Sequence, residues 1–238
     1  FDWKKAPASQ ASLFERRFLH SYIRDEYLGR GEIVELGVGG GGTAYALCLG
    51  LQESPSVFNK KGRVHLFDWY EFAPGRYASK IFFREDHKEE DKNSFEMDVV
   101  KNLKDFDGLF HIHNGDIAKV DFDIDGIEVL HIDVAKTPET FSAVMSRFFT
   151  KVNLDKNIIL HQDYASPSLS WIHYSTAALL PYIELIGPPI RSTLPFRLKR
   201  VVPDTVMDTI IYDKFTSEEK VDLIQELKKY TPVDMSGT

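Results

Sequence analysis

The sequence predicts an α/β fold built around a mostly parallel, doubly wound sheet, and three observations lead to this prediction. Short apolar runs alternate with helical patterns along the chain, as strands and crossover helices do. The run at residues 33–36 is followed at once by a glycine-rich turn and then by a helical pattern, which is typical of a nucleotide-type α/β domain. Several later apolar runs end in an acid or an amide, at the edge where such sheets bind ligands.

Length and composition limit the classes of protein to consider. The 238 residues are enough for one α/β domain with additions, so we expect a single domain over residues 1–238. The net charge of −7 argues against a nucleic-acid partner, and no apolar run approaches the roughly 18 residues that would indicate a membrane span. The single Cys48 cannot form an internal disulfide, and no signal-peptide core follows the N-terminus, so we expect a cytoplasmic protein. The chain does not begin with Met and could be a segment of a longer protein.

The first half of the chain predicts three helical regions, at 10–29, from Thr43 and at 94–106, and two strands, at 33–36 and 63–68. Residues 10–29 have helical spacing and either cap a cofactor site or pack on the sheet edge. A second helix follows the turn from Thr43, and residues 63–68 read as a strand. Residues 69–108 are an insertion with a charge-dense run at 84–92, which we interpret as a solvated helix face, a loop or a lid.

The second half predicts more strands and helices in alternation. His111 and His113 share a face of the next strand; such a pair can bind a metal, but the sequence offers no third ligand nearby, so packing is favoured. Pro138 and Pro167 each mark the start of a predicted helix. The remaining predictions are strands at 109–113, 127–133 and 157–163, a final strand pair at 182–187 and 208–213, a further strand at 198–202, and a closing helix at 217–230.

The glycine-rich turn, residues 37–42, contains five glycines and fits two ligand-binding patterns. Gly37, Gly39 and Gly42 satisfy the dinucleotide fingerprint G-x-G-x-x-G. The same turn read from Glu35 to Gly41 satisfies E-x-G-x-G-x-G. Glycine allows a close approach of the backbone to a ligand and a positive φ. Glu35 discriminates between the patterns, because a carboxylate at the strand tip repels pyrophosphate but suits a cationic ligand.

The second pattern resembles the first motif of class I S-adenosylmethionine (SAM) methyltransferases. The resemblance implies a Rossmann-like, doubly wound, mostly parallel seven-stranded sheet with an antiparallel last strand. It also implies that Asp68, at the end of a strand, binds the ribose hydroxyls, and that Asp116 and Ile117, after Gly115, bind the adenine. The residues expected to bind SAM are therefore Glu35, Gly37, Gly39, Gly41, Thr43, Asp68, Asp116 and Ile117.

Later motifs resemble those of metal-dependent O-methyltransferases of the catechol type or the macrocin sugar type. Asp133 and Lys136 form the D-x-x-K pattern of the catechol type, whereas Gln162-Asp163 fits the Asp-Asn pair of that type, after the next strand, only in part. The resemblance implies Mg²⁺ bound by Asp133, Gln162 and Asp163, with Asp133 and Lys136 catalytic. The ion would lower the pKa of a substrate hydroxyl, and Lys136 would accept its proton. Ala135 and Gln162 depart from the sugar type and leave the metal in doubt.

Alternatives remain open at this stage. A metal-free enzyme would use His161 or His131 as the base, and the acceptor pocket could be lined by Tyr164, Trp171, His173 and Tyr174. We expect SAM-dependent methylation of a small-molecule or sugar hydroxyl, and a homo-oligomer is compatible with this function. The rival functions are an NAD-type oxidoreductase and a non-catalytic SAM-fold binding protein.

Overall fold

The structure, a computed structural model, describes residues 3, 6–71 and 94–231. Its seven strands follow the sheet order β3-β2-β1-β4-β5-β7-β6, and the last strand of the chain, β7, is antiparallel to both of its neighbours. The predicted mostly parallel seven-stranded α/β fold is therefore confirmed. The chain separates into two compact units, residues 1–29 with 33–122 and residues 30–32 with 123–238. The prediction of one domain stays a prediction.

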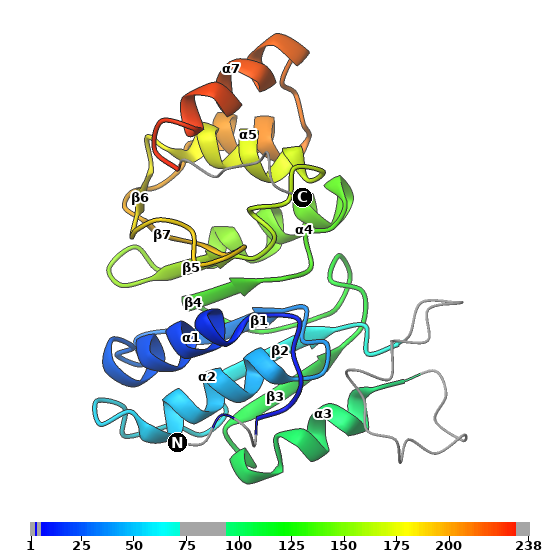
Figure 1. Cartoon of the computed structure of the whole chain (residues 1–238), viewed down its shortest axis with the longest axis vertical. Helices are drawn as coiled ribbons and strands as arrows, with labels where there is room; N and C mark the ends of the chain where they lie inside the picture. The colour runs from blue at the N-terminus through cyan, green and yellow to red at the C-terminus, as the bar shows by residue number, and fades with distance from the viewer. Residues whose placement is uncertain (1–2, 4–5, 72–93, 232–238) are drawn as a thin grey trace. The chain divides into compact units, whose positions relative to one another are not determined.

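The first unit holds the parallel strands β1 (Glu32–Leu36), β2 (Val64–Asp68) and β3 (Phe110–Asn114). Its helices are α1 (Leu13–Asp25), α2 (Gly42–Glu53) and α3 (Glu96–Asn102). Helix α1 begins where it does because Ser12 and Glu15 form a capping box. It lies beside α2 (Figure 1), and the approach is close because a Cβ at Gly50 would lie 2.5 Å from the carbonyl oxygen of His20.

The second unit holds β4 (Ile127–Ile132) parallel to β5 (Ile158–His161), and β7 (Leu194–Leu198) antiparallel to β5 and β6 (Ile183–Leu185). Every residue of β4 and β5 is buried, as expected of strands covered on both faces. The helices of this unit are α4 (Pro138–Arg147), α5 (Ser170–Leu179), α6 (Asp204–Ile211) and α7 (Ser217–Leu227).

Two predicted elements near the C-terminus were wrong. Residues 208–213 fall mostly in helix α6, not in a strand, because Pro203 precedes the helix and Met207 and Ile210 bury one side of it. The predicted strand at 198–202 overlaps β7 (Leu194–Leu198) only at its last residue, and residues 199–202 are not in a strand. The pattern missed β7 because Pro195 lies inside it, and proline argues against a strand.

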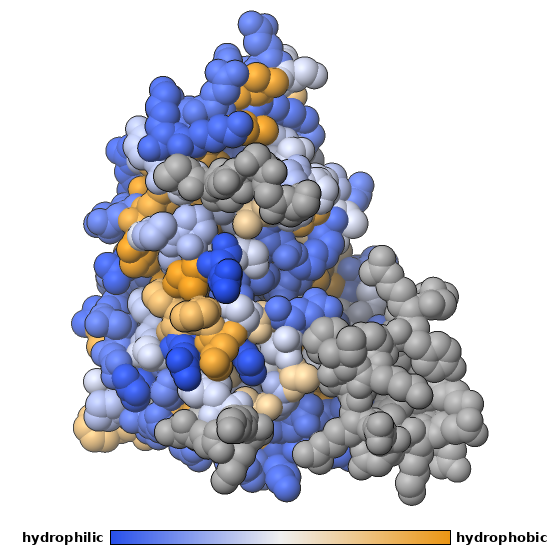
Figure 2. All heavy atoms as spheres, viewed as in Figure 1, coloured by the Kyte–Doolittle hydropathy of each residue, from blue (hydrophilic) through white to orange (hydrophobic). Residues whose placement is uncertain are grey.

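The surface is largely hydrophilic on the face shown in Figure 2. No helix among the described residues is both long and apolar enough to cross a membrane. The predicted lid at residues 84–92 lies outside the described residues. The part of the insertion that is described contributes helix α3, whose Asn102 side chain donates a hydrogen bond to the carbonyl oxygen of Gly40.

Candidate functional site

The glycine-rich turn connects β1 to α2 and depends on left-handed backbone geometry. Gly37, Gly39 and Gly41 have φ values of 90°, 50° and 83°, which L-residues rarely adopt. The N–H of Gly37 donates to the carbonyl oxygen of Phe67 at 2.8 Å, so the turn is attached to the end of β2. The glycines predicted to bind a cofactor are therefore required by the turn itself.

The carboxylate of Asp68 accepts hydrogen bonds from four backbone N–H groups. One oxygen accepts from Val38 at 2.7 Å and from Gly39 at 3.0 Å, both in the glycine-rich turn. The other accepts from Trp69 at 2.7 Å and from Tyr70 at 3.4 Å. A carboxylate has about four acceptor positions, so the turn and the following loop use the acceptor capacity that ribose hydroxyls would need. The ribose role of Asp68 stays a prediction, and its structural role is an addition to it.

Tyr70 holds the loop after β2 in an unusual conformation that sequence reasoning did not identify. Its φ is 53°, in the left-handed region, where a bulky residue is strained. The side chain is fully buried, and its hydroxyl donates to the carbonyl oxygen of Leu66 at 3.1 Å. Burial raises the pKa of this hydroxyl, and the nearby carboxylates of Asp68 and Glu35 raise it further. The loop is therefore fixed by Tyr70 on one side and by Asp68 on the other.

Glu35 and Thr43, the residues on either side of the turn, are both buried. The Glu35 side chain has an exposed fraction of 0 % and lies close enough to Cys48 to raise the pKa of that thiol, together with burial. Cys48 is therefore an inert core thiol. A buried acid beneath the turn makes the interior there electronegative, which agrees with the preference for a cationic ligand argued from the sequence.

Asp116 and Ile117 follow β3 and are joined to the same region by Gly115. The N–H of Gly115, whose φ is 148°, donates to the carbonyl oxygen of Asp68 at 3.0 Å. The Asp116 carboxylate accepts from the N–H of Ala118 at 2.9 Å and pairs with Lys119 at 3.3 Å. Ile117 is buried. The first unit thus brings together the predicted SAM-binding residues from the ends of β1, β2 and β3.

The second unit brings together Asp133, Lys136 and Asp163. The Lys136 ammonium donates to Asp133 at 2.6 Å and also to the carboxylate of Asp163. The three side chains are 21 %, 48 % and 30 % exposed, so a ligand can reach them. Asp163 has a φ of 60°, and such strain in a non-glycine residue is often found at functional sites. Sequence reasoning selected all three residues but not their ion pairs.

Gln162 is placed differently from the other residues predicted to bind the metal. Its amide nitrogen donates to the hydroxyl of Ser192 at 2.6 Å, and its amide oxygen accepts from the hydroxyl of Thr193. The Gln162 side chain is therefore hydrogen-bonded to the loop before β7. Within the part of the chain that the structure describes, no three His, Cys, Asp or Glu side chains are grouped so as to hold a metal ion.

The two candidate bases, His131 and His161, are both buried. Nδ1 of His161 donates to the carbonyl oxygen of Gln162 at 3.0 Å, while its buried Nε2 has no hydrogen-bond partner among the described residues. Burial lowers the pKa of His161 to about 4. Its ring lies against Phe141 of α4, so it packs in the core.

The aromatic residues predicted to line an acceptor pocket are mostly buried. Tyr164, His173 and Tyr174 are each nearly inaccessible. His173 donates through Nε2 to the carbonyl oxygen of Tyr164 at 2.6 Å, and the Tyr164 hydroxyl bonds to Thr231. Trp171 donates to the carbonyl oxygen of Ala135 at 3.1 Å and so supports the loop that carries Lys136. Their contact with an acceptor stays a prediction.

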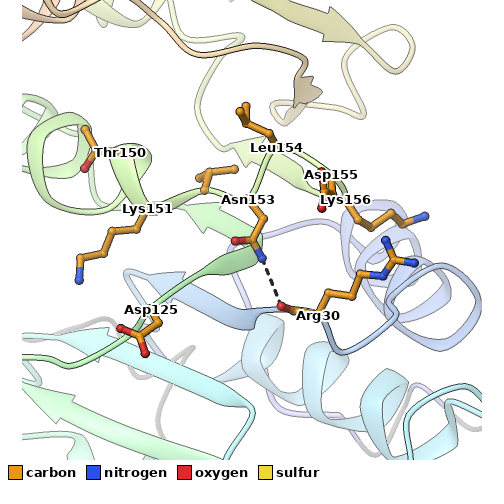
Figure 3. Close-up of a pocket in the computed structure, with 9 residues that line it drawn as sticks. Arg30, Asp125, Thr150, Lys151, Asn153, Leu154, Asp155 and Lys156 are labelled. Atoms are coloured by element: carbon orange, nitrogen blue, oxygen red, sulfur yellow. Dashed lines mark hydrogen bonds between the residues drawn. The ribbon is translucent and has the colours of Figure 1, made fainter.

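A polar hollow of about 520 Å³ lies elsewhere in the second unit (Figure 3). It is lined by residues that precede β4 and β5, among them Asp125 and Lys156, and Asn153 donates to the carbonyl oxygen of Arg30 at 3.4 Å across it. The backbone N–H of Asn153 donates to the carbonyl oxygen of Ile127, the first residue of β4, at 2.9 Å. The hollow is therefore at the amino ends of these strands, whereas Asp133 and Asp163 follow their carboxyl ends.

Two solved structures are similar to this chain over most of its length. One is the O-methyltransferase NovP, with a TM-score of 0.61 and 18 % identity over 81 % of this chain and 83 % of NovP. The other is CalS11, a TDP-rhamnose 3′-O-methyltransferase of calicheamicin biosynthesis, with a TM-score of 0.52 and 17 % identity over 78 % of this chain and 77 % of CalS11. This chain therefore shares the Rossmann-like α/β fold of these two proteins. No protein-family model and no curated protein sequence matches the chain.

Proposed function

We propose that the protein is a SAM-dependent methyltransferase that methylates a hydroxyl group of a small molecule or sugar. The observation that carries the proposal is the grouping of the glycine-rich turn, Asp68 and the Gly115-Asp116 loop at the carboxyl ends of β1, β2 and β3. Ligands of open α/β sheets bind at this edge. The fold is shared with NovP and CalS11, which are both named as O-methyltransferases, and this supports the same function.

SAM fits the chemistry of this edge better than a dinucleotide does. The fully buried Glu35 beneath the turn favours a cationic ligand over pyrophosphate. We assign SAM binding to the eight residues expected from the sequence, with Glu35 acting through its charge, Ile117 through its apolar surface and Asp68 through the turn that its carboxylate holds. When bound, SAM supplies a methyl group on a sulfonium, which a hydroxyl oxygen attacks as the C–S bond breaks and the C–O bond forms.

The residues expected to hold Mg²⁺ do not fit that ion. Mg²⁺ requires near-octahedral oxygen ligands and binds mainly through carboxylates. Here the two available carboxylates, on Asp133 and Asp163, both accept from the Lys136 ammonium. The third expected ligand, Gln162, has its amide oxygen engaged by Thr193. The lysine and the two carboxylates are therefore the groups available to act on an acceptor.

The cluster of Asp133, Lys136 and Asp163 is suited to an acceptor hydroxyl. A carboxylate of Asp133 or Asp163 accepts the hydroxyl hydrogen and takes the proton as the new C–O bond forms. The Lys136 ammonium lies between the carboxylates and donates to the negative charge that develops on the attacking oxygen. In this arrangement Lys136 donates hydrogen bonds to the developing charge, in place of the proton-accepting role expected from the sequence.

The first test is calorimetric titration with S-adenosylhomocysteine, with and without Mg²⁺, and with NAD⁺ as a control. Saturable binding of S-adenosylhomocysteine alone supports the proposal. Binding of NAD⁺ instead would mean that the turn belongs to an oxidoreductase. No binding of either ligand by a folded sample would favour a non-catalytic protein of the same fold.

The second test separates the acceptor site from the cofactor site. Lys136→Met is expected to abolish methyl transfer in an acceptor screen while S-adenosylhomocysteine binding is retained. Lys229→Met is the matched control, because Lys229 also pairs with an acid three residues away, Glu226, but on the exposed surface of the C-terminal region. Equal activity of the two variants would remove Lys136 from the mechanism.

A further inference from the structure

Three histidines lie on one face of the parallel strands β2 and β3, outside the site described above. His65 is paired with His111 in the sheet register, and Phe67 is paired with His113. Because side chains two residues apart on a strand point to the same face, all four rings share one side of the sheet. The sequence showed only His111 and His113 as neighbours; the fold adds His65 from the adjacent strand.

Two of these histidines direct ring nitrogens at each other. Nδ1 of His65 lies 3.0 Å from Nε2 of His113. Zinc–imidazole bonds are about 2.0–2.1 Å long, so two nitrogens bound to one ion at neighbouring positions lie roughly 3 Å apart. The observed separation of 3.0 Å is therefore compatible with two ligands of a single metal ion. The same distance also fits a shared proton, and the experiment below distinguishes the two.

The surroundings hold the His113 ring in place. The ring stacks on Phe67 with centroids 4.1 Å apart and planes 6° from parallel. The stacked ring presents its Nε2 toward His65, and an imidazole nitrogen is a common metal ligand in proteins.

The third histidine does not join the pair. Nε2 of His111 lies so close to Gly62 that a side chain at that position would clash with it. His111 is therefore directed at the Gly62 backbone, and among the described residues no three metal-binding side chains meet at one point. A bound ion would have two imidazole ligands and would complete its coordination with water.

We propose that His65 and His113 bind one divalent transition-metal ion, of the zinc, nickel or copper kind, across strands β2 and β3. Imidazole nitrogen suits these ions, whereas Mg²⁺ prefers oxygen. The ion replaces the proton between the two rings, and that proton moves to the other nitrogen of its own ring. The site is separate from the proposed methyl-transfer site and does not depend on it.

The test is calorimetric titration of the full chain, without any added histidine tag, with Zn²⁺ and Ni²⁺, and with Mg²⁺ as a control. We expect one saturable site for Zn²⁺ and Ni²⁺ and none for Mg²⁺. His113→Gln and His65→Gln should each weaken binding at least about tenfold. His111→Gln is the matched control, because it removes a histidine from the same face but not from the pair, and it should bind as the unmodified chain does.

A spectroscopic measurement guards against variants that fold poorly. Cu²⁺ bound to the unmodified chain should show two imidazole nitrogens in its electron paramagnetic resonance spectrum. The proposal is overturned if no saturable binding occurs, if His113→Gln binds as tightly as the unmodified chain, or if His111→Gln loses as much affinity as the other two variants. In those cases the pair shares a proton only.

Discussion

The clearest quantitative prediction concerns Asp68, whose carboxylate holds the glycine-rich turn through two N–H groups and the following loop through two more. Asp68→Asn keeps the shape of the side chain but replaces one oxygen with an amide NH₂. In either orientation of the amide, two backbone N–H groups then face a donor and not an acceptor.

The size of the effect follows from those two bonds. A hydrogen bond to a charged acceptor contributes about 1.5–3 kcal/mol. The N–H of Gly39 is on the surface and can bond to water instead, whereas Val38 is buried, so the loss is closer to that of one strong bond than of two. We expect the free energy of unfolding to fall by about 2–3 kcal/mol in the absence of any ligand.

The assay is urea denaturation followed by circular dichroism, combined with calorimetric titration of S-adenosylhomocysteine. The matched control is Asp121→Asn, because Asp121 is an exposed acid of the same unit. An unchanged free energy of unfolding in Asp68→Asn, relative to this control, would refute the structural role. If affinity for S-adenosylhomocysteine fell without loss of stability, Asp68 would act on the ligand alone.

Three further predictions concern stability. His161, whose pKa is lowered to about 4 by burial, takes up its proton mainly on unfolding; stability should therefore be complete above about pH 6.5 and fall by up to about 3 kcal/mol as the pH drops to 4. His161→Leu should flatten this part of the pH dependence measured by urea denaturation, and an unchanged slope would contradict it. Asn157→Ala should cost about 3 kcal/mol in the same assay, because the buried Asn157 side chain donates to Leu198 at 2.9 Å and accepts from it at 2.7 Å. Gly42→Ala should lower the midpoint of thermal unfolding, because its methyl group would clash with Ser9, whereas Gly187→Ala, with open space around it, should not.

The elements that the sequence predicted well carry local signals. Helix α4 begins at Pro138 after Thr137, whose side chain caps it, and helix α7 begins after Thr216 in a capping box. The strand that the pattern missed depends on a distant partner. Strand β7 forms in spite of Pro195 because Phe196 and Leu194 pair with β5, and no local pattern around residue 195 reports that pairing.

The candidate site divides in the same way. The sequence shows which strand ends carry acids, since each acid directly follows an apolar run. It does not show what the acids bind, because their partners are far along the chain: Asp163 pairs with a lysine 27 positions earlier, and Gln162 bonds to a threonine 31 positions later. Val38 and Gly39 bind Asp68 through their backbone N–H groups, which every residue except proline has, and so no residue type could indicate them.

These partners change how the acids at the strand ends are interpreted. From the sequence alone, we expected Asp133 and Asp163 to bind a divalent cation and Asp68 to bind a ribose. In the structure, Asp68 accepts hydrogen bonds from the turn that it supports. Asp133 and Asp163 both form ion pairs with Lys136. A ligand at either place must therefore compete with, or add to, interactions that the chain already makes. For the acceptor site this favours a neutral hydroxyl, which can join the existing hydrogen bonds, over a metal cation, which would have to displace the ammonium group.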